Sequence, residues 1–179
     1  MSIQSTETGS FGTVETLQDG YRLHFDRQYP LATTELATWL IDPEKTQRWW
    51  AESNVELTVG GQFNLRWLNG ENSEPMEWWN GRISALELPG LLEHTNETHG
   101  LLRWELEQVA DGTRLRFTNT ITPPEERFVT LSLAGWHLHL DHLTEVLAGG
   151  TIDWRNWYPV YEQRWEKIHQ QYQQRTNLP

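Results

Sequence analysis

The feature that most constrains this fold is a helix predicted late in the chain, after a long run of strand-like segments. At about 100° per residue, its main apolar face is formed by Val129, Trp136, Leu140, Leu143 and Leu147. We expect this face to lie on a surface built by the preceding strands. A late amphipathic helix that grips a curved sheet leaves a cavity between the two. The sequence therefore predicts an apolar pocket.

Length and composition exclude several classes of protein. The 179 residues are enough for one domain with a core that needs neither a disulfide nor a structural metal. A net charge of −11 opposes the phosphate contacts of nucleic-acid binding, so we predict no nucleic-acid partner. The absence of cysteine removes disulfides, thiolate catalysis and Cys-ligated zinc.

The distribution of apolar residues predicts where the protein resides. No run of about 18 apolar residues occurs, so no segment is expected to span a membrane. Residues 1–20 are polar and lack the basic start and apolar run of a secretory signal. We expect a cytoplasmic protein in which residues 1–20 form a flexible tail.

The pattern of apolar residues predicts the order of the secondary structure. Alternation of period 2 predicts a first strand over residues 21–29, and two short helices follow it. Thr33 or Thr34 can cap the first of these helices, and Asp42 followed by Pro43 can cap the second, which ends near Trp49. Six further strands joined by short turns are predicted around residues 55–57, 63–67, 76–86, 91–95, 102–106 and 113–119.

A second apolar face on the late helix requires a cover. Leu131 and Leu138 lie far around the helix from Trp136 and would otherwise contact water. After the glycines at 149 and 150, aromatic and apolar residues recur at spacings of three and four, which predicts a terminal helix over residues 157–175. We expect this helix to pack against the late helix, with a homodimer contact through the same aromatic stripe as the alternative.

Several short motifs in a fixed order carry a resemblance to a known family. They are Asp42-Pro43-Glu44 with Trp49-Trp50, Val59-Gly60-Gly61-Gln62-Phe63, Gly81-Arg82-Ile83, Asp111-Gly112-Thr113-Arg114-Leu115, and Gly135-Trp136 with Leu140-Asp141-His142-Leu143. In this order the chain resembles the START-like (SRPBCC) superfamily, and within it the branch of heat-shock-protein-90 ATPase activator homologues. The resemblance covers about residues 21–147.

The resemblance implies an α+β helix-grip fold, in which a curved antiparallel sheet of about six or seven strands wraps a long late helix around a hydrophobic cavity. We accordingly predict a START-like domain over residues 21–148 and a C-terminal helical extension over residues 149–179 that packs on the same domain. The superfamily shares no single active site, so the fold alone implies no reaction.

The tryptophans are the first candidates for a binding site, because eleven of them exceed what a core of this size usually contains. Core packing is the plain interpretation for most of them. A pocket lined by indole rings with few polar groups suits a small apolar or aromatic ligand. The predicted ligand-binding residues are Trp49, Trp50, Trp67, Trp79, Trp104, Trp136 and His139.

Two residues are candidates for catalysis. Glu77 shares a strand face with Trp79 and Ile83, so it enters the cavity if Ile83 points inward, and desolvation would then suit it to proton transfer. The opposite phase places Glu77 in water. His139 is the second candidate, at the edge of the cavity.

Three histidines of the late helix raise the question of a metal site. His137 and His139 diverge by about 200° on a helix, so only His139 and His142 form a usable pair. Without a third ligand we predict no metal and no cofactor, with His137 and His142 solvated or capped.

The leading hypothesis is a binding protein for a small hydrophobic or aromatic molecule, with no defined reaction. One alternative is a cyclase- or hydrolase-like enzyme that uses Glu77 or His139. The other is a stress-related or chaperone-associated interaction module. The sequence identifies neither the ligand nor the oligomeric state.

Overall fold

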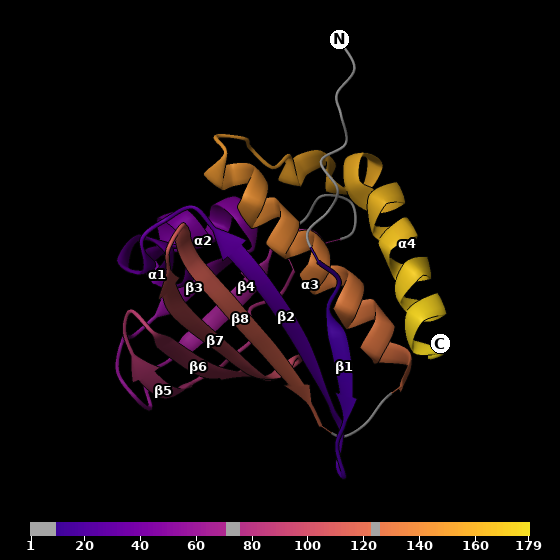
Figure 1. The fold of residues 1–179 in the computed structure, drawn as a ribbon, viewed down its shortest axis with the longest axis horizontal. Helices are drawn as coiled ribbons and strands as arrows, with labels where there is room; N and C mark the ends of the chain where they lie inside the picture. The colour runs from indigo at the N-terminus through magenta and orange to yellow at the C-terminus, as the bar shows by residue number, and fades with distance from the viewer. Residues whose placement is uncertain (1–9, 71–75, 123–125) are drawn as a thin grey trace.

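The computed structural model of the chain describes residues 10–70, 76–122 and 126–179. Its strands and helices follow the predicted order, with one additional strand at the start (Figure 1). The elements are β1 (Thr13–Thr16), β2 (Tyr21–Tyr29), α1 (Thr33–Ile41), α2 (Pro43–Trp49), β3 (Ala51–Val55), β4 (Phe63–Trp67), β5 (Ile83–Glu87), β6 (Leu91–Asn96), β7 (Gly100–Val109), β8 (Gly112–Ile121), α3 (Glu126–Leu147), a short 3-10 turn (Trp154–Asn156) and α4 (Trp157–Thr176).

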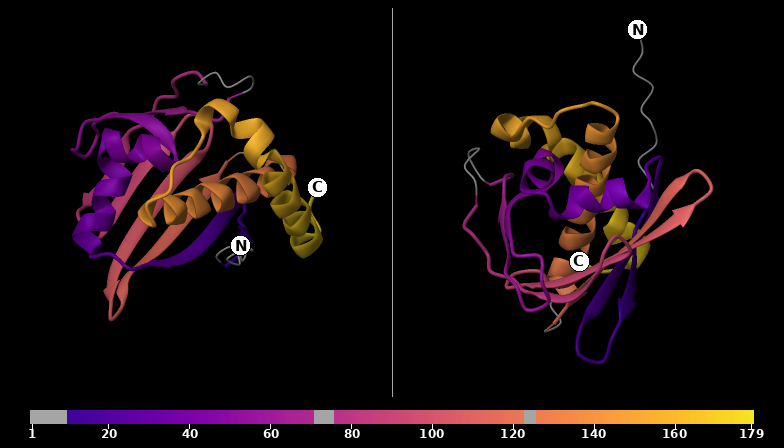
Figure 2. Two further views of the ribbon diagram at one scale, coloured as in Figure 1. Left: turned by 90° about the horizontal axis from the view of Figure 1, so that it is seen from above. Right: turned by 90° about the vertical axis from the view of Figure 1, so that its left-hand side faces the viewer.

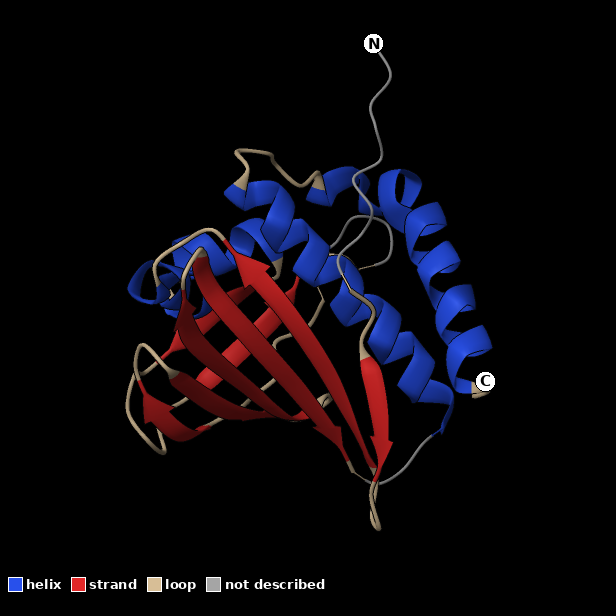
Figure 3. Cartoon of the chain, in the orientation of Figure 1, coloured by secondary structure: helices blue, strands red, loops and turns tan. Residues whose placement is uncertain are grey.

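The strands form a curved antiparallel sheet with a small second sheet beside it (Figure 3). The main sheet has six strands in the order β1-β2-β8-β7-β6-β5, and β3 pairs with β4. Isolated bridges from Gln62 to Arg82 and from Leu65 to Trp79 join β4 to the segment that precedes β5. The predicted α+β helix-grip architecture, with its long late helix and extra C-terminal helix, is confirmed.

Helix α3 lies across the face of the sheet that holds the core, and α4 lies beside α3 on the side away from β5 (Figures 1 and 2). In β2, which has the predicted bounds, Leu23 and Phe25 point to this core while Asp26 on the opposite face is exposed. None of the helices in the described ranges is long and apolar enough to cross a membrane.

The cap of α2 agrees with the prediction, but the cap of α1 does not. The Asp42 carboxylate accepts a hydrogen bond of 2.9 Å from the Glu44 backbone N–H, and Pro43 is the first helical residue. Helix α1 is preceded by Ala32 and has no side-chain cap. The Thr33 hydroxyl instead hydrogen-bonds Gln108 and Thr113, because the end of β7 and the start of β8 lie beside it.

The predicted tail is wrong for its last part. Residues Thr13–Thr16 form β1, which pairs with the edge of β2 from Thr13–His24 to Thr16–Tyr21. This strand is short and polar, so it lacks the apolar alternation by which strands are found, and its backbone hydrogen bonds hold it in place. Residues 1–9 lie outside the described residues.

Helix α4 packs along α3 through its aromatic face. Trp157, Ile168 and Tyr172 are buried there, and Arg164 pairs with Asp141 at 2.8 Å and with Glu145. These three residues of the stripe predicted for a homodimer contact are therefore covered within the chain, whereas Tyr158 of the same stripe is exposed.

Candidate functional site

One part of the interior is filled by aromatic rings. We call Trp49, Trp50, Trp104, Phe117, Phe63 and His94 the packed cluster. The indole of Trp50 lies 5.4 Å from that of Trp49 and 5.3 Å from that of Trp104, and Phe117 stacks on Trp104 at 3.9 Å between ring centroids. All three tryptophans are fully buried. The structure therefore places these three predicted ligand-binding residues in solid core, because rings from α2, β7 and β8 fill the space between them.

A pocket of about 290 Å³ lies next to the packed cluster, and we call it the open pocket. Its two walls come from different parts of the chain. One is formed by β4, residues 76–79 and the turn between β6 and β7, and the other by the first half of α3. The lining residues are Trp67, Asn69, Met76, Trp79, Thr98, His99, Phe128, Leu131, Ser132, Gly135, Trp136 and His139. Four of the predicted site residues are thus brought together: Trp67, Trp79, Trp136 and His139.

Local structure positions the three tryptophans of the open pocket. Trp67 continues the inward face of β4, and the bridge from Leu65 to Trp79 places the Trp79 indole 5.1 Å from that of Trp67. The Trp136 indole N–H donates a hydrogen bond of 3.0 Å to the Asn119 side-chain oxygen, which fixes its rotation. Trp136 therefore adds an indole of fixed rotation to the α3 wall, and Trp67 and Trp79 make the opposite wall an aromatic surface.

His99 completes this wall, and the sequence reasoning missed it. Its ring lies 4.6 Å from Trp67, 5.7 Å from Trp79 and 6.0 Å from Trp136. Burial lowers the pKa of His99 to about 4, so the imidazole is neutral near pH 7. The sequence signal for His99 is the turn between Asn96 and Gly100. This turn places His99 between the end of β6 and the start of β7.

His139 lies at the inner edge of the open pocket and is 4 % exposed. Its Nδ1 is 3.3 Å from the Trp49 carbonyl oxygen. Because a carbonyl can only accept, Nδ1 carries the proton and Nε2 has the free lone pair. Burial lowers the pKa of His139 to about 3, and the nearby His142 acts in the same direction. A neutral imidazole of fixed tautomer results.

Gly135 leaves a gap in the α3 wall. A Cβ built at this position would meet no heavy atom within 4 Å, and the residue lines the open pocket. Glycine within a helix costs about 1 kcal/mol relative to alanine. The helix therefore carries its least favourable ordinary residue at a point where a side chain would project into empty space.

Glu77 does not lie in the open pocket. Ile83 is buried and Trp79 lines the pocket, as the inward phase requires, but Glu77 is exposed. The predicted strand over residues 76–86 begins only at Ile83, and residues 76–78 lie outside any strand, so the alternation does not reach Glu77. Met76 enters the lining instead, and the catalytic hypothesis for Glu77 loses its geometric basis.

Of the expectation that His137 and His142 are solvated or capped, solvation is wrong, because α4 covers their face of α3. The hydroxyl of Tyr172 is 2.8 Å from His137 Nδ1, and the Trp157 indole N–H donates to His142 Nε2 at 3.3 Å. Both rings are fully buried, and burial lowers the pKa of both, to about 3 for His137. Within the described ranges, no three His, Cys, Asp or Glu side chains form a group that could hold a metal ion.

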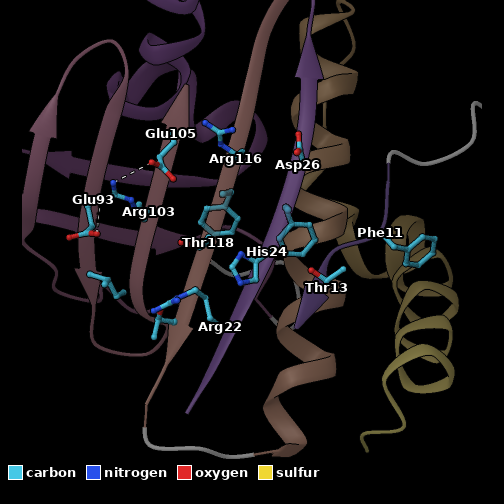
Figure 4. A pocket seen from close by; sticks show the side chains of 14 residues that line it. Phe11, Thr13, Arg22, His24, Asp26, Glu93, Arg103, Glu105, Arg116 and Thr118 are labelled. Carbon is cyan, nitrogen blue, oxygen red and sulfur yellow. Dashed lines mark hydrogen bonds and ion pairs between the residues drawn. The ribbon is translucent and has the colours of Figure 1, made fainter. Parts of the chain in front are cut away.

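A larger hollow of about 710 Å³ lies on the outer face of the main sheet (Figure 4). Arg22, Arg103 and Arg116 face it, and each pairs with a glutamate of its own or a neighbouring strand. Arg103 also pairs with Glu105 of its own strand at 3.3 Å. Since these charges are satisfied within an open sheet face, we take the smaller apolar pocket as the candidate site.

Solved structures share this architecture at low sequence identity. CalU16 from Micromonospora echinospora is 22 % identical over 90 % of each chain, with a TM-score of 0.65. The protein encoded by gene BPP1335 from Bordetella parapertussis is 22 % identical over 96 % of this chain and 95 % of its own, with a TM-score of 0.67. EF2215 from Enterococcus faecalis, a conserved protein of unknown function, is 19 % identical over 93 % and 90 %, with a TM-score of 0.68. These likenesses show the fold.

Among curated proteins no relative matches the chain. A family model does match: the one described as "Activator of Hsp90 ATPase homolog 1-like protein" covers residues 35–148. This span includes both walls of the open pocket and the packed cluster, and it is more than half of the sequence. The chain therefore belongs to the family of Activator of Hsp90 ATPase homolog 1-like proteins.

Proposed function

We propose that this protein binds a small apolar or aromatic molecule in the open pocket. The lining supports this, since it combines three indole rings with the apolar side chains of Met76, Phe128 and Leu131, and its described residues include no Asp, Glu, Lys or Arg. The predicted ligand-binding set is then reduced to Trp67, Trp79, Trp136 and His139, with His99 added.

The observation that carries the proposal is Gly135. An alanine there would favour the helix by about 1 kcal/mol, and the structure offers no steric objection to its Cβ. Helix α3 thus has a residue that disfavours the helix at a position where a larger side chain would occupy the open pocket. Space for a ligand explains this combination, whereas close packing does not.

The test is to fill this space from α3. Substitution Gly135→Leu adds a side chain inside the open pocket, and Ala148→Leu adds an exposed leucine just after the last turn of α3, outside the lining. A library of small neutral aromatic and aliphatic compounds is screened by thermal shift and calorimetry. We expect compounds that bind the natural protein and Ala148→Leu to lose at least tenfold in affinity for Gly135→Leu.

Binding of the same compounds to Gly135→Leu with unchanged affinity would place them elsewhere on the protein. A screen without any hit would also count against the proposal if the free energy of unfolding of Gly135→Leu equals or exceeds that of the natural protein. Such a stability would show that the leucine side chain fits in the open pocket, so that the pocket was present in the screen.

The enzyme hypothesis has less support. With Glu77 exposed, His139 is its remaining candidate, and an imidazole with a pKa of about 3 is a weak base at neutral pH. No Asp or Glu is among the described residues that line the open pocket. For the interaction-module hypothesis, the aromatic stripe of α4 is the candidate surface, and the packing of α4 on α3 buries Trp157, Ile168 and Tyr172 of it.

A further inference from the structure

The open pocket contains one polar atom whose chemical role is fixed by the fold. His139 Nδ1 donates to the Trp49 carbonyl oxygen at 3.3 Å, so Nε2 can only accept a hydrogen bond. Trp49 is fully buried at the end of α2, and its indole N–H donates in turn to the Trp39 carbonyl at 3.0 Å. The acceptor is thus held by a rigid part of the core.

This acceptor is free and reachable. Among the described residues, none hydrogen-bonds Nε2 of His139. This atom is also absent from the polar atoms that are fully enclosed without a hydrogen bond, so it is accessible. The contrast is with His137 Nε2 and His142 Nδ1, which are enclosed under α4 without a hydrogen bond, at 3.7 Å from Asp141 and 3.8 Å from Glu145 respectively. His139 is in the lining of the open pocket, so a molecule inside it can approach Nε2.

The charge of the lining restricts what such a molecule can be. The described residues around the open pocket include no Asp, Glu, Lys or Arg, and burial keeps both His99 and His139 neutral at pH 7. A buried charge without a paired partner is costly. The faces of Trp67, Trp79 and Trp136 favour a flat aromatic ring.

We propose that the ligand of this pocket is an uncharged aromatic molecule that donates one hydrogen bond, from a hydroxyl or ring N–H, to Nε2 of His139. This inference rests on the proposed function and deepens it, because it assigns His139 as the residue that selects among aromatic compounds. The indole rings of the lining supply affinity for any aromatic ring, and His139 separates the ligands that donate a hydrogen bond from those that do not.

A matched set of probes tests this without knowledge of the natural ligand. Indole and 1-methylindole differ in the presence of the N–H donor, while indole-3-acetate adds a negative charge and tryptamine a positive one. Dissociation constants are measured by calorimetry at pH 7. We expect indole to bind about 5- to 10-fold more tightly than 1-methylindole, and both charged probes to bind more weakly than indole.

Two variants assign the preference to its atom. Substitution His139→Leu removes the acceptor, so indole and 1-methylindole should bind with equal affinity. Substitution His139→Gln offers an amide oxygen near the position of Nε2 and should restore part of the preference for indole. A merely structural role for His139 would change both affinities together and leave their ratio unaltered.

The outcomes separate this inference from the proposed function. Equal binding of indole and 1-methylindole to the natural protein, with both lost in Gly135→Leu, would overturn the role of His139 and leave the pocket intact. Tighter binding of tryptamine or indole-3-acetate would overturn the uncharged class. Absence of binding by every probe, together with a library screen without hits, would overturn the proposed function and this inference with it.

Discussion

The packed cluster and the open pocket are built from the same residue type in neighbouring parts of the interior, yet one is solid and the other hollow. In the packed cluster, Trp50 has rings on several sides, at 5.3 Å from Trp104 and 5.7 Å from Trp136. In the open pocket, Trp67 and Trp79 face α3 across a space of about 290 Å³. Trp136 belongs to both, since it contacts the packed cluster and lines the open pocket.

Whether a tryptophan lies in the core or lines a pocket therefore depends on the helix that packs opposite it, and not on the tryptophan itself. Helix α2 brings Trp49 and Trp50 against the sheet, and nothing is left unfilled between them. At the open pocket, α3 presents Gly135. An indole lines a cavity where its partner position lacks a side chain.

Acid should have the largest effect on both regions, because each contains imidazoles that burial keeps neutral. Burial lowers the pKa to about 3 for His94 in the packed cluster and for His139, and to about 4 for His99. An unfolded histidine titrates near 6.5, so below that pH the unfolded chain binds protons that the folded chain does not. Stability must therefore fall as pH falls, by on the order of 5 kcal/mol for these three groups between pH 7 and pH 5.

Urea unfolding at a series of pH values measures this loss of stability. NMR of the imidazole protons shows which of the three histidines is protonated in the folded protein. His94 stacks on Phe63 at 3.9 Å and accepts from the Trp104 N–H, so it should stay neutral until the protein unfolds. His99 should be the first of the three to protonate in the folded state. A stability that is flat from pH 7 to pH 5 would show that these rings are not desolvated.

The next largest effect concerns the packed cluster alone. Substitution Trp50→Ala should cost about 3–5 kcal/mol of unfolding free energy, because it removes a fully buried indole from among closely packed rings. Denaturant titration followed by circular dichroism gives the value. A cost below about 1 kcal/mol would mean that the cluster is loosely packed, and the contrast with the open pocket would disappear.

The fold was largely predictable because its signals are local. The strand over residues 21–29 and the Asp42–Pro43 start of α2 agree with the structure, since alternation and capping are read from neighbouring residues. Strand β1 was not predicted, because three polar residues and a single valine at a sheet edge carry no such signal. The burial of His137 and His142 depends on α4, which lies more than ten residues further along the chain.

The site was predictable only in part because it depends on which element faces which. Sequence identified the tryptophans as a class but could not tell Trp104, which has Phe117 stacked on it, from Trp67, which lines the open pocket. The phase predicted for residues 76–86 was correct at Ile83 and at Trp79, which forms an isolated bridge, and failed at Glu77, which lies before the first bridge. Such boundaries are set by tertiary contacts that periodicity does not contain.

The adjacent residues Trp78 and Trp79 provide the finest comparison, because they differ only in the side on which they lie. Trp79 lines the open pocket beside Trp67, whereas Trp78 is 44 % exposed and lies over the Arg66 guanidinium. Substitution Trp79→Ala should weaken ligand binding about tenfold and lower stability by about 1 kcal/mol. Trp78→Ala should leave affinity unchanged and stability within about 0.5 kcal/mol.

Calorimetry with indole measures the two affinities, and urea unfolding measures the two stabilities. Glu77→Gln, on the other side of Trp78 in sequence, serves as a matched control, because this exposed carboxylate lies outside the lining of the open pocket. Equal losses of affinity in Trp78→Ala and Trp79→Ala would mean that the aromatic wall does not bind the ligand. A loss confined to Trp79→Ala would follow from the bridge between Leu65 and Trp79, which holds the Trp79 indole beside Trp67 while Trp78 stays exposed.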